Sequence, residues 1–339
     1  MSPGACDACL ATTAWLAGAV AEDRRPRRLS HAELAPRARV EDLRCAAHSA
    51  DVRLLCQHDP AWPAPLRDLD DPPAVLHHAG ALDPSSLDGP SVAIVGARRA
   101  TPYGLSTARG LARELARAGV TVISGLALGI DAAAHAGALD GGGSTVAVLA
   151  AGAERASPLT NAPLYRQLLR SGGALSELPV GSDPRPWTFP LRNRVIAALA
   201  AVTVVVEAAP RSGSLITAGV ARDLGRDVGA VPGRVCDLQA RGPNELIVDG
   251  AHPIRDAQDV LDLLFGPGAP RPSSDVADPG RDLDDRLAGI LACVREGAGT
   301  VPALVAEGVD PHDAFVALAE LELLGRLRRG PDGRFQVVA

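Results

Sequence analysis

Five short apolar runs constrain the fold of this chain more than any other feature of its sequence. Segments with apolar residues at helical spacing separate them, at 105–119, 129–139, 163–172 and 211–225. Continuous apolar strands that alternate with helices are typical of a parallel sheet with helices on both faces. We therefore predict an α/β fold over residues 66–265. The runs are SVAIVG (91–96), VTVISG (120–125), TVAVLA (145–150), AVTVVVEA (201–208) and DVGAVPG (227–233).

Composition divides the rest of the chain into three parts. Residues 1–65 are rich in Ala and Arg and predict a small helical N-terminal region. Residues 266–280 (GPGAPRPSSDVADPG) have the composition of a linker. Residues 281–339 show three helical segments followed by a hairpin pattern, RLRRGPDGRFQVVA, which predicts a winged-helix domain. This domain carries 7 arginines against 10 acidic residues, so we expect it to contact protein or to regulate rather than to read DNA bases.

Charge and hydropathy exclude several classes of protein. The net charge of -6 means that any nucleic-acid surface must be local. All 34 basic residues are arginine, which excludes a Walker A loop, a Schiff-base lysine and a kinase-type lysine. The apolar stretch from Leu10 to Val20 is interrupted by threonines, is too short to span a membrane and lacks a basic start. We predict a cytoplasmic protein with no membrane contact.

The N-terminal cysteines raise the question of a metal site. Cys6 and Cys9 have zinc-knuckle spacing, and Cys45 and Cys56 could complete a four-sulfur site. Ten residues separate the second pair, however, instead of two to four. We therefore predict free cytosolic thiols and no metal, with zinc as the alternative.

Polar clusters follow three of the predicted strands, where parallel sheets bind ligands. A dinucleotide fingerprint is not met, because Gly96 precedes Ala-Arg-Arg and the second strand ends in Ser124 and Gly125 instead of an acid. We therefore predict no cofactor. Arg98 and Arg99 lie where a guanidinium reaches a phosphate in a bidentate manner. We predict that the turns at Gly96 and at Ser124 and Gly125 also bind phosphate, because they follow buried strands.

Two predicted helix starts add to this anion site. Arg192 and Arg194 flank Asn193 at the start of an apolar helix, where they oppose the macrodipole unless an anion is shared. Phe189 could stack on a base. The start of another helix offers amides and hydroxyls for an anion, from Ser212, Gly213, Ser214 and Thr217.

A third helix start carries two titratable residues, Asp131 and His135, one turn apart. An acid/base pair is conceivable there. We interpret Asp131 instead as a helix N-cap and His135 as a hydrogen-bonded neighbour, so that both support the structure. No catalytic residue is predicted.

Taken together, six segments resemble the DNA-processing protein A family (DprA, also called Smf). They are VAIVGARRATPYG, ISGLALGIDAAAHAGAL, GGALSELPVG, FPLRNRVIAALA, VVEAAPRSGSLITA and AVPGRV…RGPNELIVDGAHPI, in order between Leu66 and Leu264. The resemblance implies an extended Rossmann-like domain that binds single-stranded DNA, forms a homodimer and hands the strand to the RecA recombinase during natural transformation. It implies DNA contacts from Arg98 and from Arg192 to Arg194. One departure is Ser157-Pro158, where the family usually shows Tyr-Pro.

Two other functions are weighed against this non-enzymatic one. Phosphoribohydrolase-like enzymes share a similar sheet, but their P-G-G-x-G-T-x-x-E signature supplies a catalytic acid that SGSLITAG lacks. Glu207 lies upstream of that segment. A structural nucleotide sensor is the third candidate.

Overall fold

The computed structural model describes residues 5–21, 37–268, 285–323, 326–330 and 333–337. The chain divides into two compact units, residues 1–272 and 273–339, and each is described by itself. Most of the predicted linker, residues 269–280, lies outside the described residues. Within the described stretches, no helix combines the length and apolar character needed to cross a membrane.

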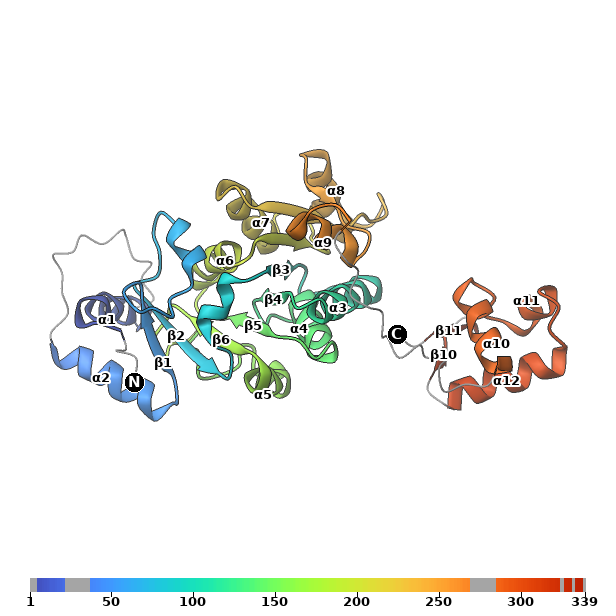
Figure 1. Cartoon of the computed structure of the whole chain (residues 1–339), viewed down its shortest axis with the longest axis horizontal. Helices are drawn as coiled ribbons and strands as arrows, with labels where there is room; N and C mark the ends of the chain where they lie inside the picture. Colours follow the sequence, from blue (N-terminus) through green and yellow to red (C-terminus); the bar gives the residue numbers. More distant parts are fainter. Residues whose placement is uncertain (1–4, 22–36, 269–284, 324–325, 331–332, 338–339) are drawn as a thin grey trace. The chain divides into compact units, whose positions relative to one another are not determined.

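The first unit is built on a nine-stranded sheet in the order β1-β2-β6-β5-β4-β3-β7-β8-β9. Figure 1 labels β1 to β6 of this sheet. All neighbours from β6 to β9 are parallel, whereas β2 is antiparallel to both β1 and β6. The predicted parallel sheet is thus confirmed for its main part and does not extend to β1 and β2. The strands are β1 (Arg53–Cys56), β2 (Val75–Gly80), β3 (Ser91–Val95), β4 (Thr121–Ser124), β5 (Thr145–Val148), β6 (Gly173–Ser176), β7 (Val202–Val205), β8 (Asp227–Ala230) and β9 (His252–Pro253).

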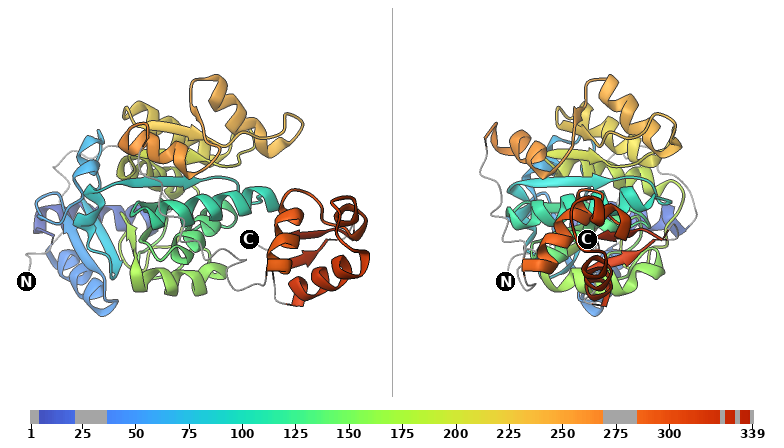
Figure 2. Two further views of the ribbon diagram at one scale, coloured as in Figure 1. Left: turned by 45° about the vertical axis from the view of Figure 1, so that its right-hand side comes forward. Right: turned by 90° about the vertical axis from the view of Figure 1, so that its right-hand side faces the viewer.

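Helices cover both faces of this sheet, as predicted (Figure 2). On one face, β3 and β4 pack through Val92, Ile94 and Val122 against α3, α4 and α9. On the other face, Ala93 and Val95 pack against α6 and α7. The helices are α1 (Asp7–Ala21), α2 (Arg37–Ser49), α3 (Pro102–Arg117), α4 (Ile130–Asp140), α5 (Ala162–Ser171), α6 (Thr188–Leu199), α7 (Gly213–Asp223), α8 (Arg241–Val248) and α9 (Ala257–Phe265), with short 3-10 turns at Ala64–Asp68, Pro84–Asp88, Leu159–Asn161 and Leu238–Ala240.

The region of residues 1–65, predicted as helical, contributes a strand as well as α1 and α2. β1 pairs with β2 and extends the sheet at its edge (Figure 1). α1 lies against this edge through a small core of Leu10, Val40 and Val75. The N-terminal region is therefore continuous with the sheet.

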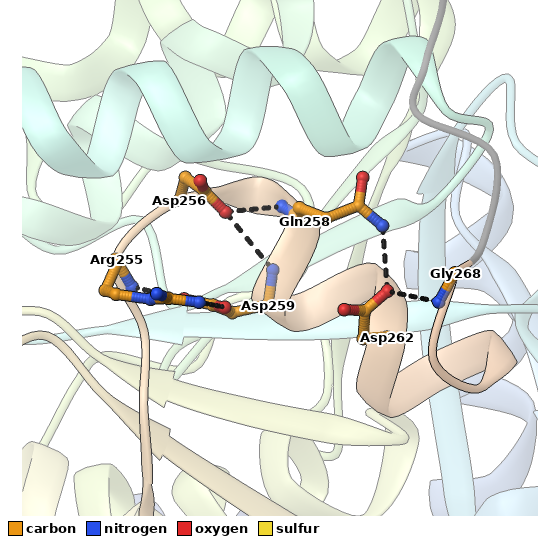
Figure 3. A network of polar contacts seen from close by, with 6 residues as sticks. All are labelled: Arg255, Asp256, Gln258, Asp259, Asp262 and Gly268. Carbon is orange, nitrogen blue, oxygen red and sulfur yellow. Dashed lines mark hydrogen bonds and ion pairs between the residues drawn. The ribbon is translucent and has the colours of Figure 1, made fainter.

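Polar contacts stabilise both ends of α9, the last helix described in the first unit (Figure 3). The Asp256 carboxylate accepts hydrogen bonds from the backbone amides of Gln258 (2.9 Å) and Asp259 (3.3 Å), which is N-capping. Near its end, the Asp262 carboxylate accepts from the Gln258 side chain (2.8 Å) and from the amide of Gly268 (3.3 Å). These bonds fix the start and the end of α9, which packs on the sheet.

The close approach of α3 and α4 depends on Gly137. A Cβ atom at this position would lie 2.1 Å from the carbonyl oxygen of Arg109 in α3. Because that neighbour is backbone, Gly137→Ala must push the helices apart, and we expect a loss of about 1–3 kcal/mol in the free energy of unfolding, measured with urea.

Gly110 is the matched control for this substitution. It lies in α3, next to Arg109, but a Cβ atom there meets nothing within 4 Å. Gly110→Ala should therefore stabilise the unit by roughly 0.5–1 kcal/mol, because alanine favours the helix. Equal stability of the two variants would contradict the packing argument.

In its described residues, the second unit contains three helices and a hairpin: α10 (Asp285–Arg295), α11 (Val301–Ala306), α12 (Pro311–Leu323), β10 (Leu327–Arg329) and β11 (Phe335–Val337). Its core includes Leu291, Leu304, Leu318 and Leu327. The element order is the one the sequence predicts, and the winged-helix assignment stays a prediction.

Candidate functional site

A pocket of about 430 Å³ opens beyond the carboxyl ends of the parallel strands. From β3 the chain builds β4, β5 and β6 on one side and β7 to β9 on the other, so the strand order reverses between β3 and β7. Ligands of open α/β sheets bind beside such a switch point. The lining residues are Arg98, Gly125, Ala127, Leu128, Ala150, Ala151, Arg155, Ala156, Ser157, Pro158, Leu159, Asp183, Pro184, Phe189 and Arg192.

Arg98 and Phe189 meet in this pocket. The exposed guanidinium of Arg98, from the β3–α3 turn, lies 4.7 Å from the centroid of the half-buried Phe189 ring on α6. This is a cation–π contact. A guanidinium that binds phosphate and an aromatic face that stacks on a base are the two groups that single-stranded nucleic acid needs.

The turn that carries Arg98 is hydrogen-bonded to Glu207, which follows β7 in the chain. The amide of Ala97 donates to the carbonyl oxygen of Glu207 at 2.7 Å. The Glu207 carboxylate in turn accepts from the amide of Thr101 at 2.8 Å and from the Thr101 hydroxyl. Gly96 is required here, because a Cβ atom would lie 2.7 Å from the Ile130 side chain. Arg98 therefore projects from a fixed backbone.

Arg192 forms part of the pocket wall and is almost fully buried. Its Nη1 donates to the carbonyl oxygens of Gly125 and Val148, both at 2.7 Å, and its Nε donates to Asn193 at 3.1 Å. A Cβ atom on residue 125 would lie 1.8 Å from Nη1, so only glycine fits. Burial lowers the pKa of Arg192 and Asp131 opposes that shift. Arg192 thus ties together the ends of β4 and β5.

Asp131 holds the same loop from the other side. Its Oδ2 accepts from the amides of Gly125 (3.2 Å) and Ala127 (3.3 Å). The N-cap of α4 is Gly129, so Asp131 does not have the capping position that the sequence predicts. Burial raises the pKa of the Asp131 carboxyl, and Arg192 opposes that shift. Arg192 and Asp131 therefore bind opposite ends of one residue, Gly125.

His135 lies inside the fold and not in the pocket lining. The Thr145 hydroxyl donates to the carbonyl of Val122 at 2.8 Å, so the Nδ1–H of His135 donates to that hydroxyl at 2.7 Å. Burial, with a contribution from Arg192, lowers the pKa of His135 to about 3. A neutral buried histidine has a structural role here.

Three other predicted residues are turned away from the pocket or are bound elsewhere. Arg194 pairs with both carboxylate oxygens of Glu177 at 2.6 and 2.7 Å. Ser124 is fully buried and donates to the carbonyl of Ile94 at 2.7 Å. Arg99 is exposed and does not line the pocket. The predicted anion site therefore does not assemble as one cluster.

The start of α7 is joined to α6, outside the pocket lining. Asn193 donates from Nδ2 to the carbonyl oxygen of Gly213 at 3.1 Å. The hydroxyls of Ser212 and Ser214 lie 2.9 Å apart, and Thr217 is buried. These residues position the two helix starts relative to each other.

Arg155 lies in the pocket but was not among the residues predicted from the sequence. It lines the pocket and donates to Asp183 and to the carbonyl of Ser182 (3.3 Å). A usable signal was present, because Arg155 follows the apolar run of β5 just as Arg98 follows that of β3. The adjoining Ser157-Pro158, where the chain departs from the family pattern, also lines the pocket.

The cysteines do not form the four-sulfur set that the sequence offers as the alternative to free thiols. Cys45 is exposed on α2 and lies outside the cluster. Cys6, Cys9 and Cys56 converge instead with His58, and all four ligand atoms lie within 4.8 Å of one another. The sequence signal for His58 was its position two residues after Cys56, since histidine is a zinc ligand as well as cysteine.

Comparison with known proteins finds one matching family and several similar relatives. Residues 53–265 match the model of a family described as DNA recombination-mediator protein A. Protein Smf of Synechocystis is 35% identical over 317 residues, which are 84% of this chain and 80% of that protein. The DNA processing protein DprA of Bacillus subtilis is 40% identical over 205 residues, covering 60% of this chain and 68% of that protein.

Two solved structures are similar to the fold. DprA from Streptococcus pneumoniae has a TM-score of 0.63 at 31% identity and covers 75% of this chain and 94% of that one. A structure that describes the single-stranded DNA binding mode of DprA from Helicobacter pylori has a TM-score of 0.54 at 33% identity. It covers 58% of this chain and 90% of that one.

Proposed function

Because the chain belongs to the DNA recombination-mediator protein A family, we propose that it binds single-stranded DNA in the pocket at the carboxyl edge of the sheet. The pair of Arg98 and Phe189 carries this proposal, since it combines a phosphate-binding cation with a stacking face at 4.7 Å. The DNA binding described for the Helicobacter pylori relative supports it.

Each pocket residue has a separate part in the proposed binding. Arg98 binds a backbone phosphate, and Phe189 stacks on an adjacent base. Arg192 keeps the wall in place and adds positive potential from below the surface, while Arg155 is partly neutralised by Asp183. Since the chain as a whole carries a charge of -6, the attraction for DNA must be local. Because it acts on phosphates, the affinity should decrease as the salt concentration rises.

The same proposal includes two partners. The resemblance to that family implies a homodimer that hands its strand to the RecA recombinase. We therefore propose RecA loading and a homodimer, both supported by the family membership. The acidic α12, with Asp313, Glu320 and Glu322 and no arginine, suits a protein contact better than a DNA groove.

The phosphoribohydrolase-like alternative has less support. Its catalytic acid would have to be Glu207. That carboxylate is buried and is already bound by the amide and hydroxyl of Thr101. A Cβ atom on Gly104 would also lie 2.4 Å from it, so the helix start of α3 closes over the group. A substrate would have to displace this contact before it could reach the acid.

The test is fluorescence anisotropy with labelled single-stranded and duplex DNA of equal length. We expect a preference for the single strand. Arg98→Ala should weaken single-strand binding by about tenfold. The negative slope of log K against log salt should become shallower by about 0.7, because one phosphate contact is lost.

Arg222→Ala is the matched control. Arg222 is exposed in the last turn of α7, at the end of the helix away from the pocket edge, and its loss should change neither the affinity nor the slope. Arg192 is not used here, because its backbone contacts confound binding with stability. If both DNA forms bind equally, or if Arg98→Ala binds as the wild type does, the pocket is not the single-strand binding site.

A further inference from the structure

Four soft ligand atoms converge at the edge of the sheet, away from the DNA-binding pocket. The Nδ1 of His58 lies 3.6 Å from the Sγ of Cys6, and 3.7 Å from the Sγ of Cys9 and from that of Cys56. The Sγ atoms of Cys6 and Cys56 are 4.0 Å apart. From this geometry we propose that the chain binds one zinc ion through Cys6, Cys9, Cys56 and His58.

The distances agree with tetrahedral zinc. Bonds of about 2.3 Å to sulfur and about 2.05 Å to nitrogen give tetrahedron edges of about 3.6 Å from nitrogen to sulfur and about 3.8 Å between sulfurs. The observed separations of 3.6–3.7 Å and 4.0 Å match these edges within a few tenths of an ångström. Ligand atoms within 4.8 Å of one another leave room for a single ion and not for a cluster.

Local backbone structure brings the ligands together. Cys6 and Cys9 lie at the start of α1, where the amide of Leu10 donates to the carbonyl of Cys6 at 3.0 Å. Cys56 ends β1, and the amide of Asp59 donates to its carbonyl at 2.8 Å. This turn folds His58 back over Cys56.

A second set of contacts holds the two ligand pairs against each other. The amide of Ala5 donates to the carbonyl of Leu54 in β1 at 3.2 Å. Arg44 of α2 donates to the carbonyl of Ala5 at 3.1 Å and pairs with Asp7 at 2.6 Å. The start of α1 is thus placed on β1 and α2 by contacts that do not involve the ligand atoms.

Donor chemistry selects the metal and its role. Three thiolates and one imidazole are the ligand set of structural Zn²⁺, and four protein ligands leave no open position for a substrate. A disulfide does not account for the cluster, because three sulfurs surround one nitrogen and the Cys6–Cys56 separation of 4.0 Å is about twice a disulfide bond. The ion would fasten α1 to the edge strand, whose core of small apolar residues is limited.

The metal content of the full-length chain tests the proposal. We expect about one zinc ion per chain after purification with zinc present, measured by inductively coupled plasma mass spectrometry. Cys9→Ser and Cys56→Ser should lose the ion. Cys45→Ser is the matched control, since Cys45 is exposed on α2 and lies outside the cluster, and it should keep the full content.

Two further measurements keep the proposal open to refutation if the buried-cysteine variants do not fold. His58→Ala changes an exposed side chain and should release zinc to a chelator that the wild type resists. Cobalt substitution of the wild type should give the thiolate-to-metal absorption of a tetrahedral site. Wild-type chain without zinc and without a cobalt spectrum, a Cys6–Cys56 disulfide in its place, or zinc loss in Cys45→Ser would each overturn the site. None of these results depends on DNA binding.

Discussion

Arg192→Met is expected to lower the free energy of unfolding of the first unit by roughly 3–5 kcal/mol, the range for leaving a buried charge without the opposite charge that compensates it. The buried guanidinium is bonded to the carbonyl oxygens of Gly125 and Val148, and those acceptors would lose their partner. The Asp131 carboxylate would remain buried without the positive charge that does most to stabilise its ionised form. Urea unfolding followed by tryptophan fluorescence measures the loss, because all three tryptophans lie within residues 1–272.

A double-mutant cycle with Asp131→Asn separates the charge from the packing. The asparagine oxygen can still accept from the amides of Gly125 and Ala127, but it leaves no buried charge behind when Arg192 is absent. The double variant should therefore be more stable than the sum of the two single losses predicts, by at least about 1 kcal/mol. Strict additivity, or a loss of under about 1 kcal/mol in Arg192→Met, would show that the two charges are not coupled through Gly125.

The comparison of Arg192 with Arg194 shows what the sequence could and could not predict about the site. Both arginines were expected to bind an anion. Residues two apart on a helix point in different directions, and only the packing of α6 decides that Arg192 lines the pocket while Arg194 pairs with Glu177. Ser124 fails for a related reason, because a strand-end hydroxyl satisfies the carbonyl of Ile94 before it can meet a ligand.

The strands show a similar division. Those with continuous apolar runs, such as β3 and β7, were predicted because burial on both faces leaves a strong signal. β2 contains His77 and His78 and β6 begins at Gly173, so neither has such a run. Their pairing is recognisable only once the chain has folded back, and the same holds for the contact between the Arg98 guanidinium and Phe189.

Stability of the first unit should fall steeply when the pH drops from about 7.5 to 5, because three histidines are buried in their neutral form. Burial lowers the pKa of His77 and of His78 to about 4 and that of His135 to about 3. In the unfolded chain a histidine has a pKa near 6.5, so below that value the unfolded state binds more protons and is favoured. The free energy of unfolding is therefore highest above about pH 6.5 and decreases towards pH 4. At pH 5 each of these histidines lowers it by roughly 2 kcal/mol.

Other buried groups act in the opposite direction, so a variant is needed to assign the effect. Burial raises the pKa of the carboxyls of Asp131 and Glu177, and these groups take up protons more readily in the folded state as the pH falls. His135→Asn can keep a donor for Thr145 and removes one titrating ring, so the difference in unfolding free energy between wild type and variant should change by about 2 kcal/mol from pH 7.5 to 5.

His48→Asn provides the comparison on the surface, because His48 is exposed on α2 and should leave the pH profile of the wild type unchanged. The contrast between the two variants tests burial itself as the cause. The Nε2 of His135 is buried and has no hydrogen-bond partner among the described residues, so it cannot be protonated without exposing the ring or opening the fold. If His135→Asn loses stability as steeply as the wild type does, the ring must gain access to water in the folded state, and the space between α4 and the sheet would have to be open to solvent.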